Sequence, residues 1–192
     1  MSTSLHWLIL RAGPVELEDW ARGNLAASER ARLSGLRFER RRRSFLLGRF
    51  AAKMLLAGAE PDLANTPPAG FAILNGPEGA PYVDVAGRGR LAGCLSLSHC
   101  EDGAACAWCS DPACRHGIDL ERVEARHPAF ADDYLTPAEN AFAADLPEAL
   151  RPVWITLAWS AREAALKALG AGLRLDTRRL AVSPPEPASM AA

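Results

Sequence analysis

The chain lacks any apolar run close to the roughly 20 residues that a membrane-spanning helix needs, which argues against a membrane protein. Its first residues have no basic start and no small-residue cleavage site, so we expect no secretory signal and a cytoplasmic location. Both standard glycine-rich phosphate loops, Gly-x-x-x-x-Gly-Lys-Ser/Thr and a helix-opening Gly-x-Gly-x-x-Gly, are also missing. A ligand rich in phosphate would therefore have to be held by side chains.

Lysine is scarce, with only Lys53 and Lys167 against 20 arginines. A lysine in such an arginine-rich chain suggests that a compact point charge is needed at that place. The net charge of −1 argues against a nucleic-acid-binding polycation, yet residues 22–53 hold ten basic and two acidic residues. Within it, the arginine-rich segment 37–53 is a solvated basic face, a phosphate-binding segment or a contact with a nucleic-acid backbone.

The five cysteines are an odd number, and without an export signal they favour reduced thiols over disulfides. Cys106, Cys109, Cys114 and His116 invite a zinc site. However, residues 103–109 have the pattern of a buried strand, on which residues three apart point to opposite faces. Small buried hydrophobic side chains are the favoured interpretation, with zinc as the lesser alternative.

An apolar content of 49% and a charged content of 23% are typical of a folded soluble protein, and 192 residues predict one domain or two small lobes. Helices followed by strands occur twice, which permits a two-lobed α+β architecture. The patterns predict helices within 14–57, from 136 and over 151–169, and strands at 81–85, 94–100, 104–109 and 116–123.

The first group of residues with possible chemistry is Asp119 and Glu121. On a strand these carboxylates share a face, and two hard oxygen ligands at that separation suit Mg²⁺. The alternative is an ordinary edge strand with a solvated acidic face.

The second group is Glu163 and Lys167, which lie four residues apart on one helix face. They form either a helical salt bridge worth about 0.2–0.5 kcal/mol, or a metal-binding oxygen beside a phosphate-binding ammonium. Glu163 could also close a capping box with Ser160, although the apolar run before Ser160 favours a continuous helix.

Together, Gly117–Glu121 and Trp159–Lys167 resemble the paired signature of the 4′-phosphopantetheinyl transferases. Three upstream segments are similar to family motifs in the same order: Phe45–Lys53, Gly79–Tyr82 and Leu95–Cys100. The resemblance covers about residues 38–175.

The resemblance implies an α+β fold with two similar lobes related by a pseudo-two-fold axis. Each lobe would be a small, mainly antiparallel sheet packed with helices, as in the larger monomeric members. We expect an N-terminal lobe at 1–112, a C-terminal lobe at 113–182 with the metal site at the lobe interface, and a disordered tail at 183–192.

The activity implied is transfer of the phosphopantetheine arm of coenzyme A to a serine of an acyl or peptidyl carrier protein. By resemblance, Asp119, Glu121 and Glu163 hold Mg²⁺, Glu163 takes the serine proton and Lys167 stabilises the leaving phosphate. No nucleic-acid or membrane partner is implied.

The resemblance also implies nucleotide contacts. Ser98 and His99 are expected to contact the phosphates of coenzyme A, while Arg49, Lys53 and Arg162 add positive charge around the nucleotide. The basic excess within 22–53 would also steer an acidic carrier protein.

Ala80 departs from the family pattern, which has lysine there, and Arg162 stands where lysine is usual. These departures and the few residues after Leu180 motivate an alternative, a non-catalytic module that binds a carrier protein or coenzyme A. Residues 40–43, four consecutive arginines, motivate a third hypothesis, a basic nucleic-acid-binding protein. The complete set of metal-binding and base residues favours the enzyme.

Overall fold

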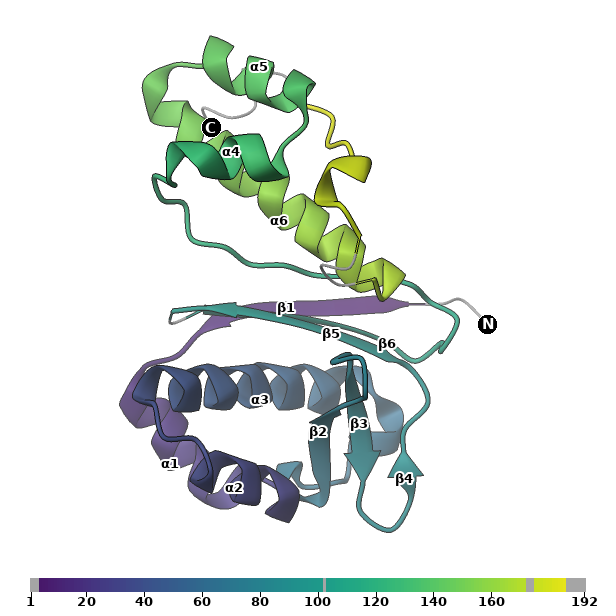
Figure 1. Cartoon of the computed structure of the whole chain (residues 1–192). Coiled ribbons are helices and arrows are strands. Elements are labelled where there is room, and N and C mark those ends of the chain that lie inside the picture. The colour runs from purple at the N-terminus through teal and green to yellow at the C-terminus, as the bar shows by residue number, and fades with distance from the viewer. Residues whose placement is uncertain (1–3, 102, 172–174, 186–192) are drawn as a thin grey trace. The chain divides into compact units, whose positions relative to one another are not determined.

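The computed structural model describes residues 4–101, 103–171 and 175–185 and divides the chain into two compact units, 1–120 and 121–192 (Figure 1). Helices and two small antiparallel sheets confirm the α+β class. Both sheets lie in the first unit, whereas the described part of the second unit is helical and irregular. No helix in the described residues is long and apolar enough to span a bilayer.

The described residues of the first unit form three α-helices and six strands. Its helices are α1 (Pro14–Asn24), α2 (Ala27–Ser34) and α3 (Glu39–Ala59). Its strands are β1 (Leu5–Arg11), β2 (Phe71–Asn75), β3 (Pro81–Val85), β4 (Gly89–Arg90), β5 (Cys94–Cys100) and β6 (Gly103–Cys109). The strands form two sheets, ordered β1-β6-β5 and β2-β3-β4.

Strand β6 lies at the centre of the first sheet, and all seven of its residues are buried. It is rich in small side chains and packs against α3, where the Cys106 thiol donates to the Ala51 carbonyl (3.3 Å). Figure 1 shows α3 running along this sheet. The predicted hairpin of 94–100 and 104–109 is confirmed, with its turn at Glu101 in the left-handed region (φ 44°).

A buried carboxylate ties the helices of this unit to the second sheet. Glu29, in the first turn of α2, accepts a hydrogen bond from the Ala26 amide (2.9 Å) and another from the Ile73 amide of β2 (2.8 Å). The ammonium of Lys53, on α3, lies 2.7 Å from the same carboxylate. Both charged side chains are 1% exposed. One carboxylate therefore joins α2, α3 and β2.

The second unit contains α4 (Pro128–Tyr134), α5 (Pro137–Asp145) and α6 (Arg151–Leu169). Short 3₁₀ turns lie at Pro61–Leu63 and Pro68–Gly70 in the first unit and at Glu148–Leu150 and Thr177–Arg179 in the second. The predicted start of α5 is confirmed, because Thr136 and Glu139 form a capping box. Helix α6 has the predicted bounds and ends at Gly170 in the left-handed conformation (φ 64°).

The strand predicted at 116–123 is absent, because residues 115–127 have no regular secondary structure. The Ile118 amide donates to the Ser96 side chain of β5 (3.0 Å). A side chain takes the place of a backbone ladder here, so strand geometry does not orient Asp119 and Glu121. Of the predicted tail, residues 186–192 lie outside the described part of the chain.

We expect Glu29→Gln to lower the free energy of unfolding by about 3–5 kcal/mol, because it leaves the Lys53 charge buried without a counterion. Urea unfolding followed by circular dichroism measures this change. The control is Glu18→Gln, whose half-exposed carboxylate lies 3.8 Å from Arg42, and which should cost less than about 0.5 kcal/mol. Equal losses in both variants would contradict the role of Glu29.

Candidate active site

Strand β5 positions Asp119 through two serines on one of its faces. Ser96 and Ser98 are two residues apart and therefore point the same way. Ser96 holds the Ile118 amide, and the Ser98 hydroxyl donates to Asp119 Oδ1 at 2.7 Å. The alternating pattern of 94–100 thus fixes the position of a carboxylate 21 residues further along the chain.

His99 lies on the opposite face of β5, in line with Leu95 and Leu97, which pack into the core below α3. The imidazole is exposed and its Nδ1 lies 2.9 Å from the Ser44 hydroxyl of α3. Because Ser98 and His99 point in opposite directions, they cannot both contact one phosphate from the same side. Sequence reasoning did not single out Ser44, although it directly precedes the motif that begins at Phe45.

A pocket of about 350 Å³ lies in the first unit beside Arg49. Its polar lining consists of Ser28, Glu29, Arg32, Arg49, Asn75 and Tyr82. The Arg49 guanidinium stacks 4.0 Å from the centre of the Phe45 ring and donates to the Ile73 carbonyl (3.0 Å). Burial lowers the pKa of Arg49 to about 10, although Glu29 opposes this. The pocket therefore combines two guanidinium groups with aromatic and amide side chains.

Lys53 is buried and does not line this pocket. Besides Glu29, its ammonium donates to the carbonyls of Asn24 (3.0 Å), Pro68 (2.6 Å) and Phe71 (2.7 Å). Burial lowers the pKa of Lys53, and Glu29 raises it back only in part. With its hydrogen bonds used inside the protein, this lysine is better suited to holding the fold than to contacting a nucleotide.

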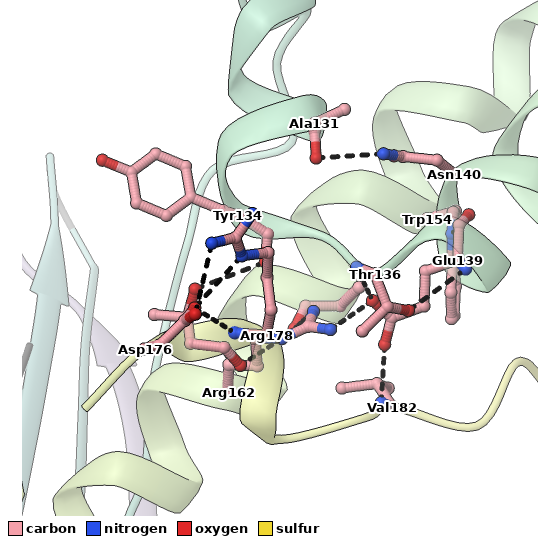
Figure 2. A network of polar contacts seen from close by, with 12 residues as sticks. Ala131, Tyr134, Thr136, Glu139, Asn140, Trp154, Arg162, Asp176, Arg178 and Val182 are labelled. Carbon is pink, nitrogen blue, oxygen red and sulfur yellow. Dashed lines mark hydrogen bonds and ion pairs between the residues drawn. The ribbon is translucent and has the colours of Figure 1, made fainter.

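The second unit repeats this arrangement around Glu139, as Figure 2 shows. Glu139 accepts hydrogen bonds from the amides of Thr136 (2.7 Å) and Val182 (2.6 Å) and pairs with Arg162 of α6. Arg162 also donates to the Thr177 carbonyl (3.1 Å) and is fully buried. The cation follows the carboxylate by 24 residues in the first unit and by 23 in the second. Arg162, like Lys53, holds helices together.

Burial tends to raise the pKa of Glu139, but the Arg162 guanidinium and the backbone amides of Thr136 and Val182 outweigh it. The pKa of this carboxyl is therefore lowered. The ion pair with Glu139 thereby anchors Arg162 and one face of α6, the helix that bears the candidate catalytic residues.

Helix α6 turns its candidate residues away from that buried pair. Ala158, Arg162 and Leu166 are buried and recur every four residues. Trp159, Glu163 and Lys167 each follow one of them by one position, so they form a separate, partly exposed stripe.

Glu121 is held at one end of this stripe. Its Oε1 accepts a hydrogen bond from Trp159 Nε1 (3.1 Å), and its Oε2 pairs with Arg126 (3.0 Å). The indole at position 159 thus joins Glu121 to the helix that bears Glu163. Arg126 escaped sequence reasoning, because it lies in a segment without periodic pattern.

The predicted carboxylates are divided between the two units, with Asp119 in the first and Glu121 and Glu163 in the second. Among the residues that the structure describes, no group of three or more His, Cys, Asp or Glu side chains is arranged to bind a metal. The five cysteines are free thiols, and burial raises the pKa of Cys106 to about 12. Cys106 behaves as a small core side chain, as the favoured interpretation predicted.

Residues 115–190 match the family described as the 4′-phosphopantetheinyl transferase superfamily. A similar curated protein is the 4′-phosphopantetheinyl transferase HetI of Nostoc sp. PCC 7120, 29% identical over 180 residues, which are 91% of this chain and 72% of that protein. Another is a holo-[acyl-carrier-protein] synthase of Streptococcus pyogenes serotype M12, 38% identical over 64 residues, or 30% of this chain and 54% of the relative. The family model thus matches the C-terminal part of the chain, and the similarity to HetI extends over most of it.

Two solved structures are also similar. The holo-(acyl-carrier-protein) synthase of Bacillus anthracis, described as a complex with CoA (3′,5′-ADP), is 22% identical with a TM-score of 0.47, covering 56% of this chain and 96% of its own. The synthase of Thermotoga maritima is 21% identical with a TM-score of 0.44, covering 61% and 68%.

We expect the stability of the second unit to depend on pH through Glu139. Its pKa is lowered in the folded state, so the pair stabilises the fold above the unfolded value of about 4.3 and loses this contribution as the pH falls further. Urea unfolding at pH 7 and pH 4 measures the difference. Glu139→Gln should reduce this pH dependence, whereas the exposed control Glu148→Gln should keep it; an unchanged dependence in both would disprove the assignment.

Proposed function

We propose that this protein transfers the 4′-phosphopantetheine moiety of coenzyme A to a serine hydroxyl of an apo acyl or peptidyl carrier protein, releasing adenosine 3′,5′-bisphosphate. The observation that carries the proposal is the stripe of Trp159, Glu163 and Lys167 on α6, with Glu121 bonded to its first member. All four residues lie inside the segment that matches the family. They supply the kinds of group that a phosphoryl transfer needs, carboxylates and an ammonium.

Asp119, Glu121 and Glu163 would hold Mg²⁺, because carboxylate oxygens are the hard ligands that this ion prefers. The chain itself keeps Asp119 and Glu121 two residues apart. A guanidinium already lies at Glu121 Oε2, which marks that oxygen as a position that attracts positive charge. When bound, the ion would neutralise the negative charge that the pyrophosphate carries during transfer.

In the proposed transfer, one residue of α6 accepts a proton and another stabilises the leaving phosphate. The serine oxygen forms a bond to the phosphorus that carries the pantetheine arm, and the bond from that phosphorus to the leaving nucleotide breaks. Glu163 accepts the serine proton, directly or through a water. Lys167 offers a proton or a positive charge to the departing phosphate.

The pocket beside Arg49 is the proposed site for the nucleotide end of coenzyme A. Arg32 and Arg49 provide positive charge for phosphate, while Tyr82 and Phe45 offer aromatic surface for a base. Ser98 and His99 remain proposed phosphate contacts on the two faces of β5. Lys53 and Arg162 contribute through the fold, because their cations are already satisfied inside the protein.

The exposed start of α3 is the proposed approach for an acidic carrier protein. Arg37, Arg40 and Arg41 are exposed there, within the basic segment 22–53. Positive charge of this kind raises the association rate with an acidic partner. The proposal includes a monomeric, cytoplasmic enzyme with neither nucleic-acid nor membrane partner, which light scattering and binding to duplex DNA at varied salt would check.

The two-lobed organisation, with a boundary near residue 113, is part of the same proposal. Glu29 and Glu139 are 110 residues apart in the sequence. The residues whose amides donate to them, Ile73 and Val182, are 109 residues apart. This offset makes residues 115–121 the counterpart of β1 at Leu5–Arg11. A second lobe that begins near 113 is consistent with that correspondence.

Mass spectrometry of an apo carrier protein incubated with this protein, coenzyme A and Mg²⁺ tests the activity. We expect a mass gain of one phosphopantetheine arm that EDTA abolishes. Asp119→Ala, Glu163→Ala and Lys167→Ala should each slow transfer by about 10²-fold or more. The exposed control Glu148→Ala should transfer at the wild-type rate. Coenzyme A binding without any mass gain, across fatty acid, polyketide and peptide carriers, would favour the non-catalytic module.

The nucleotide site makes a separate prediction. Arg49→Gln and Arg32→Gln should each raise the KM for coenzyme A by about tenfold, since each removes a charge-assisted hydrogen bond to phosphate. Initial rates at saturating carrier protein measure this effect. Arg22→Gln, which removes an exposed arginine paired with Asp19, is the control. An unchanged KM in both pocket variants would place the nucleotide elsewhere.

A further inference from the structure

The two oxygens of Glu121 have partners of different character. Oε1 accepts a hydrogen bond from the neutral indole of Trp159 at 3.1 Å, and Oε2 pairs with the Arg126 guanidinium at 3.0 Å. The side chains of Glu121 and Arg126 are 29% and 16% exposed, so the pair is largely removed from water. An ion pair in such a place interacts more strongly than one on the surface.

Arg126 is held beside Glu121 by an aromatic cluster. Its guanidinium lies 4.5 Å from the centre of the Phe130 ring, a cation–π contact. Phe130 packs against Tyr134 and Trp159, with ring centres 4.8 and 5.3 Å away. The same aromatic group therefore supports both partners of Glu121.

The fit of Arg126 is nevertheless incomplete. Its Nε is buried and makes no hydrogen bond in the described structure. Among the described residues, Glu121 is the carboxylate with which this guanidinium forms an ion pair. A buried donor without an acceptor costs free energy, which lowers the cost of moving the guanidinium away.

We propose that Arg126 is a built-in counterion of Glu121 that competes with the divalent cation for this carboxylate, while Trp159 keeps the carboxylate in place. This proposal rests on the proposed function, in which Glu121 is a metal ligand. A metal ion needs the electron pairs of the carboxylate oxygen that Arg126 now occupies, and the two cations repel each other. Metal binding therefore requires the guanidinium to leave Oε2.

The consequence is a site that keeps Glu121 neutralised without metal and binds the metal more weakly than the carboxylates alone would allow. The neutral Trp159 hydrogen bond at Oε1 carries no positive charge and is compatible with a metal at Oε2. A purely structural ion pair would have a different effect, because removing its cation would disorder Glu121 and weaken metal binding.

The test measures Mn²⁺ affinity from the electron paramagnetic resonance signal of the free ion, without coenzyme A or carrier protein. We expect Arg126→Gln to bind Mn²⁺ about tenfold more tightly than the wild type, the effect of roughly 1.4 kcal/mol of removed competition. Arg126→Lys, which keeps the charge, should restore the weaker affinity. The matched control Arg178→Gln, which removes a guanidinium 3.1 Å from Asp176 in the same unit, should leave affinity unchanged.

Tryptophan fluorescence provides the second measurement, because Trp159 bonds directly to Glu121. We expect Mn²⁺ to change the emission of the wild type and not that of Trp159→Phe. Glu121→Gln, combined with Arg126→Gln, should cancel the gain in affinity. Circular dichroism establishes that each variant is folded, and Arg126→Lys supplies the comparison if Arg126→Gln is not.

An affinity that is unchanged or weaker in folded Arg126→Gln would overturn the proposal, as would a gain that persists after Glu121→Gln. Absence of Mn²⁺ binding in both wild type and variant would overturn it too. Transfer of phosphopantetheine, assayed separately, decides the proposed function. Failure of that assay with a tenfold affinity gain would reject the enzyme and keep the competition at Glu121.

Discussion

A carboxylate buried at the start of a short helix, paired with a cation from a long helix, holds each unit of this protein together. Glu29 and Lys53 do this in the first unit, and Glu139 and Arg162 in the second. Each carboxylate also takes the amide of a third segment, so three parts of the chain depend on one charged group. Removing either partner would leave a buried charge without compensation and would therefore destabilise the unit.

The second of these pairs determines what α6 can present to a substrate. Arg162 turns inward to Glu139, and the helical repeat then brings the neighbouring Glu163 onto another face with Lys167. Two adjacent residues of one motif thus have different tasks, one in the fold and one in the proposed chemistry. The same division separates Lys53, whose ammonium is used internally, from Arg49, which lines a pocket.

Both the fold and the proposed reaction depend on the neutralisation of charged groups by groups of opposite charge. A phosphate-rich substrate would bring several negative charges, and the proposed site would meet them with guanidinium groups in the pocket and an ammonium on α6. Within the protein, the Arg126 guanidinium balances the charge of the Glu121 carboxylate. The aromatic cluster of Phe130, Tyr134 and Trp159 would give the proposed replacement of Arg126 by a metal ion a low-dielectric setting.

The sequence alone determined the features that depend on neighbouring residues. The capping box of Thr136 and Glu139, the hairpin of 94–109 and the extent of α6 follow local rules, and helix geometry then places Glu163 and Lys167 on one face. The motifs at 117–121 and 159–167 already indicated the similarity that the family model finds over residues 115–190. Only the tertiary structure decided the burial of Lys53 and Arg162, the irregular backbone at 115–127 and the pairing of Arg126 with Glu121. The burial of Lys53 and Arg162 depends on carboxylates more than 20 residues away in the sequence. The irregular backbone depends on side chains that replace backbone hydrogen bonds. The pairing of Arg126 with Glu121 forms in a segment with no periodic pattern, so the sequence does not predict where these side chains point.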